Sequence, residues 1–302
     1  MSLFTQSVYV LTSSAFTVDD LETALAAFDI LGNIEKPSED HWAFGGEGLI
    51  LSGVRPGSRL LVDIIGNDWK DAFEDPEDPV LGAVWEAGGF GPLVFPGCIE
   101  RAGKQAWAWK LASAAVRTHN SFVRLRMTFA SDNGGEPKIS DGDALEDLSF
   151  LTLAAAALLS NEDKAICFFN PNGEALRSKE LVHSGLDHHA ETGEPPLDLW
   201  TNLRLTRIGD GVVRMDSVGM QQFGLPDFEA VFPEGTLPYA DVDRFLRDLM
   251  LYLLDRGDVV GDGDVVDGPS GDWKAERIQA EGPPPRPVLR FAPVNPLAQI
   301  SA

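Results

Sequence analysis

Two β-rich segments joined through Gly-Asp-Gly restrict the fold of this chain more than any other feature. The segments read LWTNLRLTRIG over residues 199–209 and GVVRMDSVGM over residues 211–220. A turn this short, with glycine at both ends, is typical of a β-hairpin between antiparallel strands. A third β-rich segment, LPDFEAVFP, follows at residues 225–233. We therefore predict a largely antiparallel sheet in this part of the chain.

Helical periodicity follows these strands at residues 238–257, where Gly257 ends the pattern. Four further helices are predicted, at residues 17–29 with Thr17 as the cap, 98–119, 144–160 and 173–186. Other strands are predicted at residues 7–12, 41–53, 58–66, 120–130, 164–170, 273–280 and 287–293. Residues 67–97 are rich in proline, glycine and acids, which predicts a long irregular connection with a short helix near residues 80–86.

The order of these elements predicts an α+β protein with two lobes, each a mostly antiparallel sheet with helices packed on one face. Strand, helix, strands, helix and strand in the first half are typical of a split β-α-β, ferredoxin-like plan. Residues 131–143, SDNGGEPKISDGD, consist of turn formers and charges. We predict an N-terminal lobe at 1–130, a linker at 131–143 and a C-terminal lobe at 144–302.

The formal net charge of −23 limits the partners that the protein can bind. It argues against nucleic acid and against anionic membranes, because their phosphates would be repelled. An acidic face for a basic partner and simple solubility both remain compatible with it. No apolar run reaches the roughly 20 residues that span a bilayer. Cys98 and Cys167 lie in apolar stretches, which indicates buried free thiols, and we expect a cytoplasmic protein.

The stretch VGMQQFGLPDFEAVFP at residues 218–233 holds the candidate catalytic residues. One interpretation is a folding corner, in which glycines permit unusual backbone angles and apolar side chains are buried. The other is a cleft in which Asp216, Asp227 and Glu229 act as catalytic carboxylates. The spacing of the apolar residues favours the corner, with the carboxylates nearby serving to keep the molecule soluble.

Metal and cofactor sites have little support in the sequence. Glu180, His183 and Asp187 have helical spacing and could supply ligands to a metal ion, but Gly185 interrupts the pattern. Residues 257–272 resemble a calcium loop only in their acidity, since the EF-hand spacing fails. The glycine-rich stretch at 44–53 lacks a nucleotide-binding pattern. We expect no cofactor and no resident metal.

One segment resembles a known family. Trp200 opens a strand, and Gly219-Met220, Phe223-Gly224-Leu225-Pro226, an acid and Phe228-Glu229 follow. These residues are similar to an uncharacterised bacterial family, the domain of unknown function numbered four-two-six-one, with the best match over residues 198–232. The first half of the chain is similar to the rest of the longer members of that family. The resemblance implies no known activity, substrate or cofactor.

Two functions from different classes are consistent with these observations. The favoured one is a non-catalytic interaction protein whose acidic surface and 67–97 segment bind a basic protein. An immunity protein that neutralises a toxin would be one form of it. The alternative is an enzyme with a carboxylate-lined site between the lobes, formed by Asp216, Asp227 and Glu229, with His183 as an optional further member.

Overall fold

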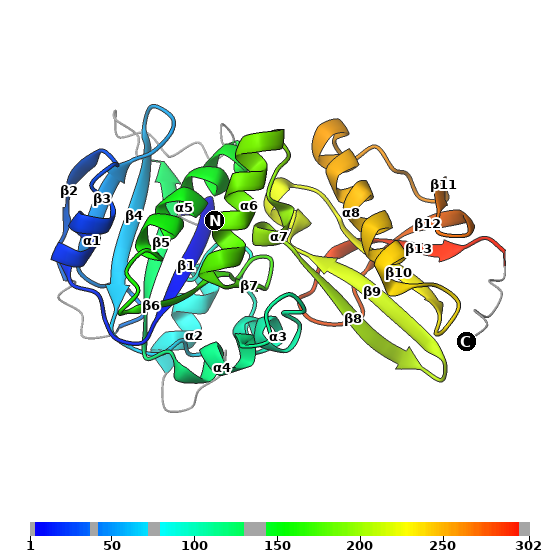
Figure 1. Ribbon diagram of the computed structural model, residues 1–302, viewed down its shortest axis with the longest axis horizontal. Helices are drawn as coiled ribbons and strands as arrows, with labels where there is room; N and C mark the ends of the chain where they lie inside the picture. The colour runs from blue at the N-terminus through cyan, green and yellow to red at the C-terminus, as the bar shows by residue number, and fades with distance from the viewer. Residues whose placement is uncertain (1–3, 37–41, 72–78, 130–142, 296–302) are drawn as a thin grey trace. The chain divides into compact units, whose positions relative to one another are not determined.

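The computed structural model describes residues 4–36, 42–71, 79–129 and 143–295. The chain divides into two compact units, Met1–Trp200 and Thr201–Ala302. Each unit contains one sheet, with helices packed against it (Figure 1). Eight α-helices and thirteen strands lie in the described ranges. The α+β class and the two mostly antiparallel sheets are therefore confirmed.

The first unit is built on a seven-stranded sheet in which all neighbouring strands are antiparallel. Its order is β2-β3-β4-β5-β1-β6-β7. The bounds are β1 Gln6–Thr12, β2 Ile30–Ile34, β3 Gly48–Ser52, β4 Ser58–Ile65, β5 Ser121–Phe129, β6 Ala165–Asn170 and β7 Ala175–Arg177. Strand β1 is buried at every residue, so both faces of the sheet must be covered.

The ferredoxin-like plan is present at the centre of this sheet. Strands β6, β1, β5 and β4 are consecutive neighbours and alternate in direction. As a result β1 runs parallel to β4 with β5 between them, and β5 runs parallel to β6 with β1 between them. These are the two split β-α-β relations of the plan. Strands β2, β3 and β7 extend the sheet on either side.

Helices cover both faces of this sheet, so the prediction of helices on one face is wrong for the first unit. Helices α1 (Val18–Ala24) and α5 (Ala144–Leu158) belong to one layer, in which Phe28 and Phe150 pack 5.5 Å apart. Helices α2 (Pro79–Glu86), α3 (Cys98–Lys104) and α4 (Ala112–Thr118) form a buried cluster with Tyr9, Leu11 and Phe122. No buried residue of α5 belongs to that cluster, so α5 packs against the opposite face.

The described parts of residues 67–97, predicted as an irregular connection, contribute side chains to the core. The predicted short helix is confirmed as α2. Trp69, Trp85 and Phe90 are all buried, and the rings of Trp85 and Phe90 stack at 4.3 Å. Trp69 also makes an edge contact with Tyr9 on the central strand. Residues 72–78 lie outside the described ranges. These three aromatic residues are therefore used for packing.

Two predicted helices are divided differently in the structure. The predicted helix at 98–119 is two helices, α3 and α4, which pack closely because Gly103 lacks a side chain. A Cβ there would lie 3.0 Å from Val116 Cγ2. The predicted helix at 173–186 begins instead as strand β7, which pairs with β6. Helix α6 (Lys179–Thr192) then starts after the Ser178 cap.

The boundary between the units also differs from the prediction. Residues 144–200, predicted to open a second lobe, belong to the first unit. The reason is that β6 pairs with β1, with Val10 opposite Phe168, a contact between distant segments. The predicted linker at 131–143 lies, apart from Asp143, outside the described residues. Within the described part of the chain, no helix combines the length and apolar character needed to cross a membrane.

The second unit is a six-stranded sheet in the order β11-β12-β13-β10-β9-β8. Its strands are β8 Asn202–Gly209, β9 Val212–Val218, β10 Asp227–Pro233, β11 Val265–Gly268, β12 Gly271–Gln279 and β13 Pro287–Pro293. Strands β8 and β9 are the predicted hairpin, although residues 197–200 form the short helix α7 (Leu197–Trp200). All strand pairs are antiparallel except β10 with β13.

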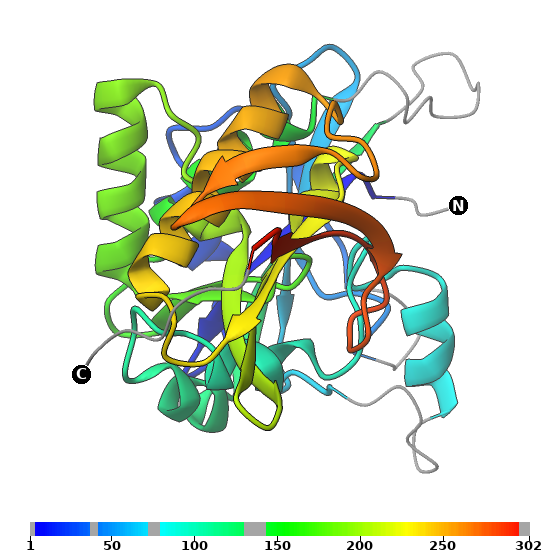
Figure 2. The same cartoon turned by 90° about the vertical axis from the view of Figure 1, so that its right-hand side faces the viewer.

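One helix, α8 (Tyr239–Arg256), covers one face of the second sheet (Figure 2). Its Phe245 packs 5.4 Å from Trp273 of β12 and 5.6 Å from Phe291 of β13. The helical period of the sequence produces this face, whose buried residues are Val242, Phe245, Leu246, Met250 and Leu253. Helices on one face are therefore confirmed for this unit. Charged side chains from the same strands lie on the other face.

Candidate functional site

Two of the predicted catalytic acids lie directly opposite each other on neighbouring strands. Asp216 of β9 pairs in register with Glu229 of β10. Side chains alternate along a strand, so both carboxylates lie on the face away from Phe228 and α8. Like charges in directly opposite positions destabilise a sheet. The pair therefore needs compensating charge from its neighbours.

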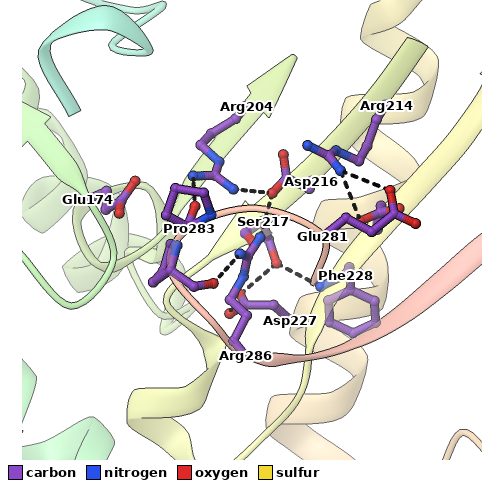
Figure 3. A network of polar contacts seen from close by, with 12 residues as sticks. Glu174, Arg204, Arg214, Asp216, Ser217, Asp227, Phe228, Glu281, Pro283 and Arg286 are labelled. Atoms are coloured by element: carbon purple, nitrogen blue, oxygen red, sulfur yellow. Dashed lines mark hydrogen bonds and ion pairs between the residues drawn. The ribbon is translucent and has the colours of Figure 1, made fainter. Parts of the chain in front are cut away.

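Arginines on the outer strands supply that charge in the same register. Arg204 of β8 stands opposite Asp216, and Arg290 of β13 stands opposite Glu229. Both pairs form ion pairs, with Arg290 Nε 2.6 Å from Glu229 Oε1. Figure 3 shows Arg204 pointing toward Asp216. Across four strands the charges therefore run positive, negative, negative, positive.

Arg286 adds a third cation from the loop between β12 and β13. This loop is closed by a hydrogen bond of 2.9 Å from Ala280 N to Arg286 O. The Arg286 side chain donates to Asp216 and to the carbonyl of Ser217, and its Nε lies 3.3 Å from Asp227 Oδ2 (Figure 3). One buried guanidinium thus ties the loop to the ends of β9 and β10.

Asp227, the third predicted acid, stabilises the turn between β9 and β10. Its Oδ1 accepts hydrogen bonds from Ser217 Oγ at 2.7 Å and from Met220 N at 3.1 Å. Gly219, with φ of 126°, precedes a 3-10 turn (Met220–Phe223), and Gly224, with φ of 73°, ends it. Both angles lie in a region that favours glycine. These contacts support the interpretation of residues 218–233 as a folding corner.

Burial sets the electrostatics of the three acids. Asp216, Asp227 and Glu229 are each 1% exposed, so the idea that they keep the molecule soluble is wrong. Burial raises the pKa of Asp227, and Arg286 opposes that rise. Burial likewise raises the pKa of Glu229, against the effect of Arg290 and Arg214. Each carboxylate is engaged by at least one arginine, as expected for charges held inside a protein.

The three predicted acids do not line the cavity near the start of β10 in the second unit. This cavity has a volume of about 240 Å³ and is lined by Pro226, Arg277, Ile278, Gln279, Pro287 and Val288. A general acid or base must reach a substrate proton, and these carboxylates instead contact guanidinium groups and backbone amides. The arrangement holds strands β8, β9, β10 and β13 together through ion pairs.

The three predicted metal ligands do not form a site. Glu180, His183 and Asp187 all lie on α6, where Glu180 and Asp187 are exposed. A hydrogen bond from Ser178 lowers the pKa of Glu180. Among the described residues, no group of three or more His, Cys, Asp or Glu side chains could hold a metal ion.

The first unit contains a second buried charge network, which the sequence analysis missed. Arg124 of β5 is fully buried and binds Asp63 of β4 through Nε at 3.0 Å and Nη2 at 2.6 Å. It also donates to the carbonyls of Ala43, Phe44 and Gly89. Although burial alone would raise the pKa of Asp63, Arg124 and Arg126 bring it below its usual value. Burial and the nearby Arg124 lower the pKa of Arg126 to about 10.

The sequence contained a weak signal for both networks. Charged residues interrupt strands that are otherwise apolar, as in Leu-Val-Asp-Ile-Ile at residues 61–65. Arg124 and Arg126 alternate along the strand predicted at residues 120–130, but their partner Asp63 lies on another strand. Arg204, Arg214, Arg286 and Arg290 were missed in the same way. An ionic side chain inside a buried strand requires a partner, so its presence alone indicates a buried pair.

Exposed acids gather in a different part of the second unit. The acidic segment, residues 258–276, forms the end of the α8–β11 connection, β11 and most of β12. It carries one lysine and six acids, all exposed: Asp258, Asp262, Asp264, Asp267, Asp272 and Glu276. Asp267 and Asp272 stand directly opposite each other in the β11–β12 hairpin. Neither forms an ion pair with any described residue.

Comparison with known families places this unit in context. The model of the family described as Domain of unknown function (DUF4261) matches residues 216–292. The match confirms the resemblance, although it begins at Asp216 and extends well beyond the expected end at 232. It contains the corner, α8, the acidic segment and the Arg286 loop. Neither the curated proteins nor the solved structures contain a match to the chain.

Proposed function

We propose that this protein is a non-catalytic cytoplasmic binding protein whose acidic segment engages a basic protein partner. The observation that carries the proposal is the contrast between two sets of carboxylates in the second unit. The interior set, Asp216, Asp227 and Glu229, is neutralised by arginines. The exterior set lies in the acidic segment and is exposed, and of its six acids Asp258 forms an ion pair with Arg277.

The opposed pair Asp267 and Asp272 strengthens this proposal. Two carboxylates directly across a hairpin repel each other, which reduces the stability of the hairpin. A lysine or arginine from a partner would lie between them and remove the repulsion. Complementary charge of this kind increases association rate and selectivity. The pair therefore has a physical use in binding that it lacks in folding.

Two further observations fit the proposal. Cys98 and Cys167 are both free and buried, which is typical of proteins from a reducing compartment. Burial raises the pKa of both thiols, so neither is poised as a nucleophile. An immunity protein that binds a basic toxin is one form that such a function could take. Of residues 67–97, Trp69, Trp85 and Phe90 are buried and serve packing, so we place the binding surface on the acidic segment instead.

The test compares two variants that carry the same net charge. The segment variant is D262N/D264N/D267N/D272N, and the control variant is E22Q/D187N/E191Q/D248N, whose substituted residues are all exposed and lie outside the acidic segment. The probe is a fluorescent decapeptide of alternating arginine and valine, measured by anisotropy with the full chain. Both variants lose four negative charges, so overall attraction changes equally.

We expect the segment variant to bind the probe about tenfold more weakly than the wild type, equivalent to about 1.4 kcal/mol. The control variant should stay within about twofold, and added salt should weaken wild-type binding because it screens exposed charges. Equal losses in the two variants would mean that the peptide responds only to net charge. Binding that ignores salt would contradict the proposal as well.

A further inference from the structure

We infer that strand β11 is a docking edge, to which an extended cationic segment of the partner adds as a further antiparallel or parallel strand. This inference rests on the proposed function and specifies how the partner is held. Addition of a strand to an open sheet edge is a common mode of peptide recognition. Three features of the acidic segment support it: the position of β11, the direction of its backbone groups and the chemistry of its exposed side chains.

Strand β11 lies at the end of the second sheet and pairs only with β12 among the described strands. The residues of β12 alternate in the direction of their hydrogen bonds. Ala275 accepts from Gly263 and donates to Asp264 on the β11 side, whereas Asp272 accepts from Val294 on the β13 side. Odd-numbered residues of β12 therefore face β11.

This alternation shows which N–H and C=O groups of β11 do not bond to β12. Val266 pairs with Trp273 and Gly268 pairs with Gly271, so these two residues of β11 bond inward. The N–H and C=O groups of Val265 and Asp267 then point away from β12, toward the open edge. An added strand can bond to all four groups without disturbing the existing hairpin.

The exposed side chains indicate the chemistry of the added strand. Val265 is 56% exposed, and Asp267 lies two residues further along on the same side. Asp267 and Asp272 form a pair that does not exchange backbone hydrogen bonds, which is the closer type of cross-strand pair. A strand that alternates arginine or lysine with small apolar residues would place all its cations on the face shared by Val265 and Asp267, with one cation beside the acidic pair and the aliphatic stem of the next against Val265.

A second copy of this chain is not the occupant. Pairing two β11 strands would bring the acidic segments together and place Asp264 and Asp267 near their own counterparts. Like charges at an edge prevent such self-association. Charge repulsion therefore disfavours pairing of two β11 strands, whereas a cationic strand would be attracted to this edge.

The decisive variant is Val265→Pro, which removes an outward N–H without changing charge. Proline is tolerated at strand edges where its nitrogen faces solvent, and the bonds to β12 use Val266 and Gly268. The matched control is Val265→Thr, which keeps the N–H group and the branched shape. The probe is again the arginine–valine decapeptide, together with a decapeptide of alternating arginine and proline that has the same charge but fewer backbone donors.

We expect Val265→Pro to bind the arginine–valine peptide about tenfold more weakly, which corresponds to one or two lost hydrogen bonds. Val265→Thr should stay within about twofold of wild type, and the arginine–proline peptide should bind wild type about tenfold more weakly than the arginine–valine peptide. Near-ultraviolet circular dichroism of Trp273 and its neighbours checks that Val265→Pro remains folded.

The outcomes separate this inference from the proposed function. In one outcome, Val265→Pro binds the arginine–valine peptide normally, wild type binds the arginine–proline peptide normally, and the segment variant does not bind. The docking-edge inference is then wrong, and the proposal that the acidic segment binds a basic partner is supported. If the segment variant also binds normally, both are wrong. If Val265→Pro unfolds, the comparison of the two peptides on the wild-type chain decides the question alone.

Discussion

Single residues in this protein show that the environment of an acid decides its role. Asp216 of β9 and Asp267 of β11 lie on strands of the same sheet. Asp216 is 1% exposed and bound by Arg204 and Arg286, whereas Asp267 is exposed without a described ion pair. Both acids stand in short β-rich stretches, between Met215 and Ser217 and between Val266 and Gly268. Only the pairing of distant strands distinguishes them, so the sequence alone could not.

Substitution of Asp216 should reveal its structural role. Asp216→Asn leaves Arg204 and Arg286 buried beside a neutral group, and breaking a buried ion pair in this way costs about 3 kcal/mol or more. Urea unfolding monitored by tryptophan fluorescence measures the free energy of unfolding. Asp210→Asn in the exposed β8–β9 turn is the control and should change it by less than about 0.5 kcal/mol. A similarly small change for Asp216→Asn would show that the buried network does not stabilise the fold.

His119 should make stability depend on pH. Its Nε2 accepts a hydrogen bond from Trp69 N at 2.8 Å, and its Nδ1 lies 2.6 Å from Val116 O, a pattern that needs the neutral ring. Burial lowers the pKa of His119 below the usual 6.5. The unfolded chain therefore binds the proton first, so this contribution is present above about pH 6.5 and is lost as the pH falls below it.

The measurement compares wild type with His119→Gln in urea unfolding between pH 7.5 and 5.5. Both proteins share every other titrating group, so the difference between them isolates the histidine. We expect the advantage of the wild type to shrink as the pH falls. Parallel pH profiles would contradict this assignment of His119.

Secondary-structure elements were predictable where local signals were strong. The β8–β9 hairpin and α8 follow from a short glycine turn and from a clear helical period. The break between α3 and α4 was missed because close packing at Gly103 overrides a helical pattern. Strand β2 (Ile30–Ile34) was missed because it is a short edge strand whose pattern is not strictly alternating. In the candidate site, the sequence indicated the three acids, but their arginine partners lie on other strands and on the loop between β12 and β13.

The corner between β9 and β10 should depend on the backbone of Gly224. A Cβ at this position would meet no atom within 4 Å, so any cost of a side chain comes from its φ of 73°. Gly224→Ala should lower the free energy of unfolding by about 1–2 kcal/mol. Gly224→Asn should cost less, because asparagine tolerates the left-handed region better. Equal effects of the two substitutions in urea unfolding would point to a cause other than backbone strain.

The β11–β12 hairpin should become more stable when one of its two opposed acids, Asp267 and Asp272, is neutralised. Asp267→Asn removes the repulsion of Asp272 and should raise the free energy of unfolding by about 0.2–1 kcal/mol at low salt. The gain should shrink as salt is added, because both groups are exposed. Thermal unfolding at two salt concentrations measures both effects. A loss of stability at low salt would mean that Asp267 has a favourable partner.

Across the whole molecule, buried acids are paired with arginines, whereas the acids of the acidic segment are exposed. Two interior networks, around Asp63 in the first unit and around Asp216 in the second, pair acids with arginines. Among the described residues, the acidic segment places six exposed acids at one edge of the second sheet. The composition predicted an acidic protein, but it could not show which acids are buried and which are exposed. The central claim is that the interior acids hold the fold while this segment binds the partner.

Hydrogen–deuterium exchange of the full chain, with and without the arginine–valine decapeptide, tests that claim most directly. Our account predicts that the peptide slows exchange in fragments covering residues 262–276 and leaves fragments covering the corner at 216–229 unchanged. Slower exchange at the corner, or a slight effect spread evenly over the exposed acids of both units, would contradict it.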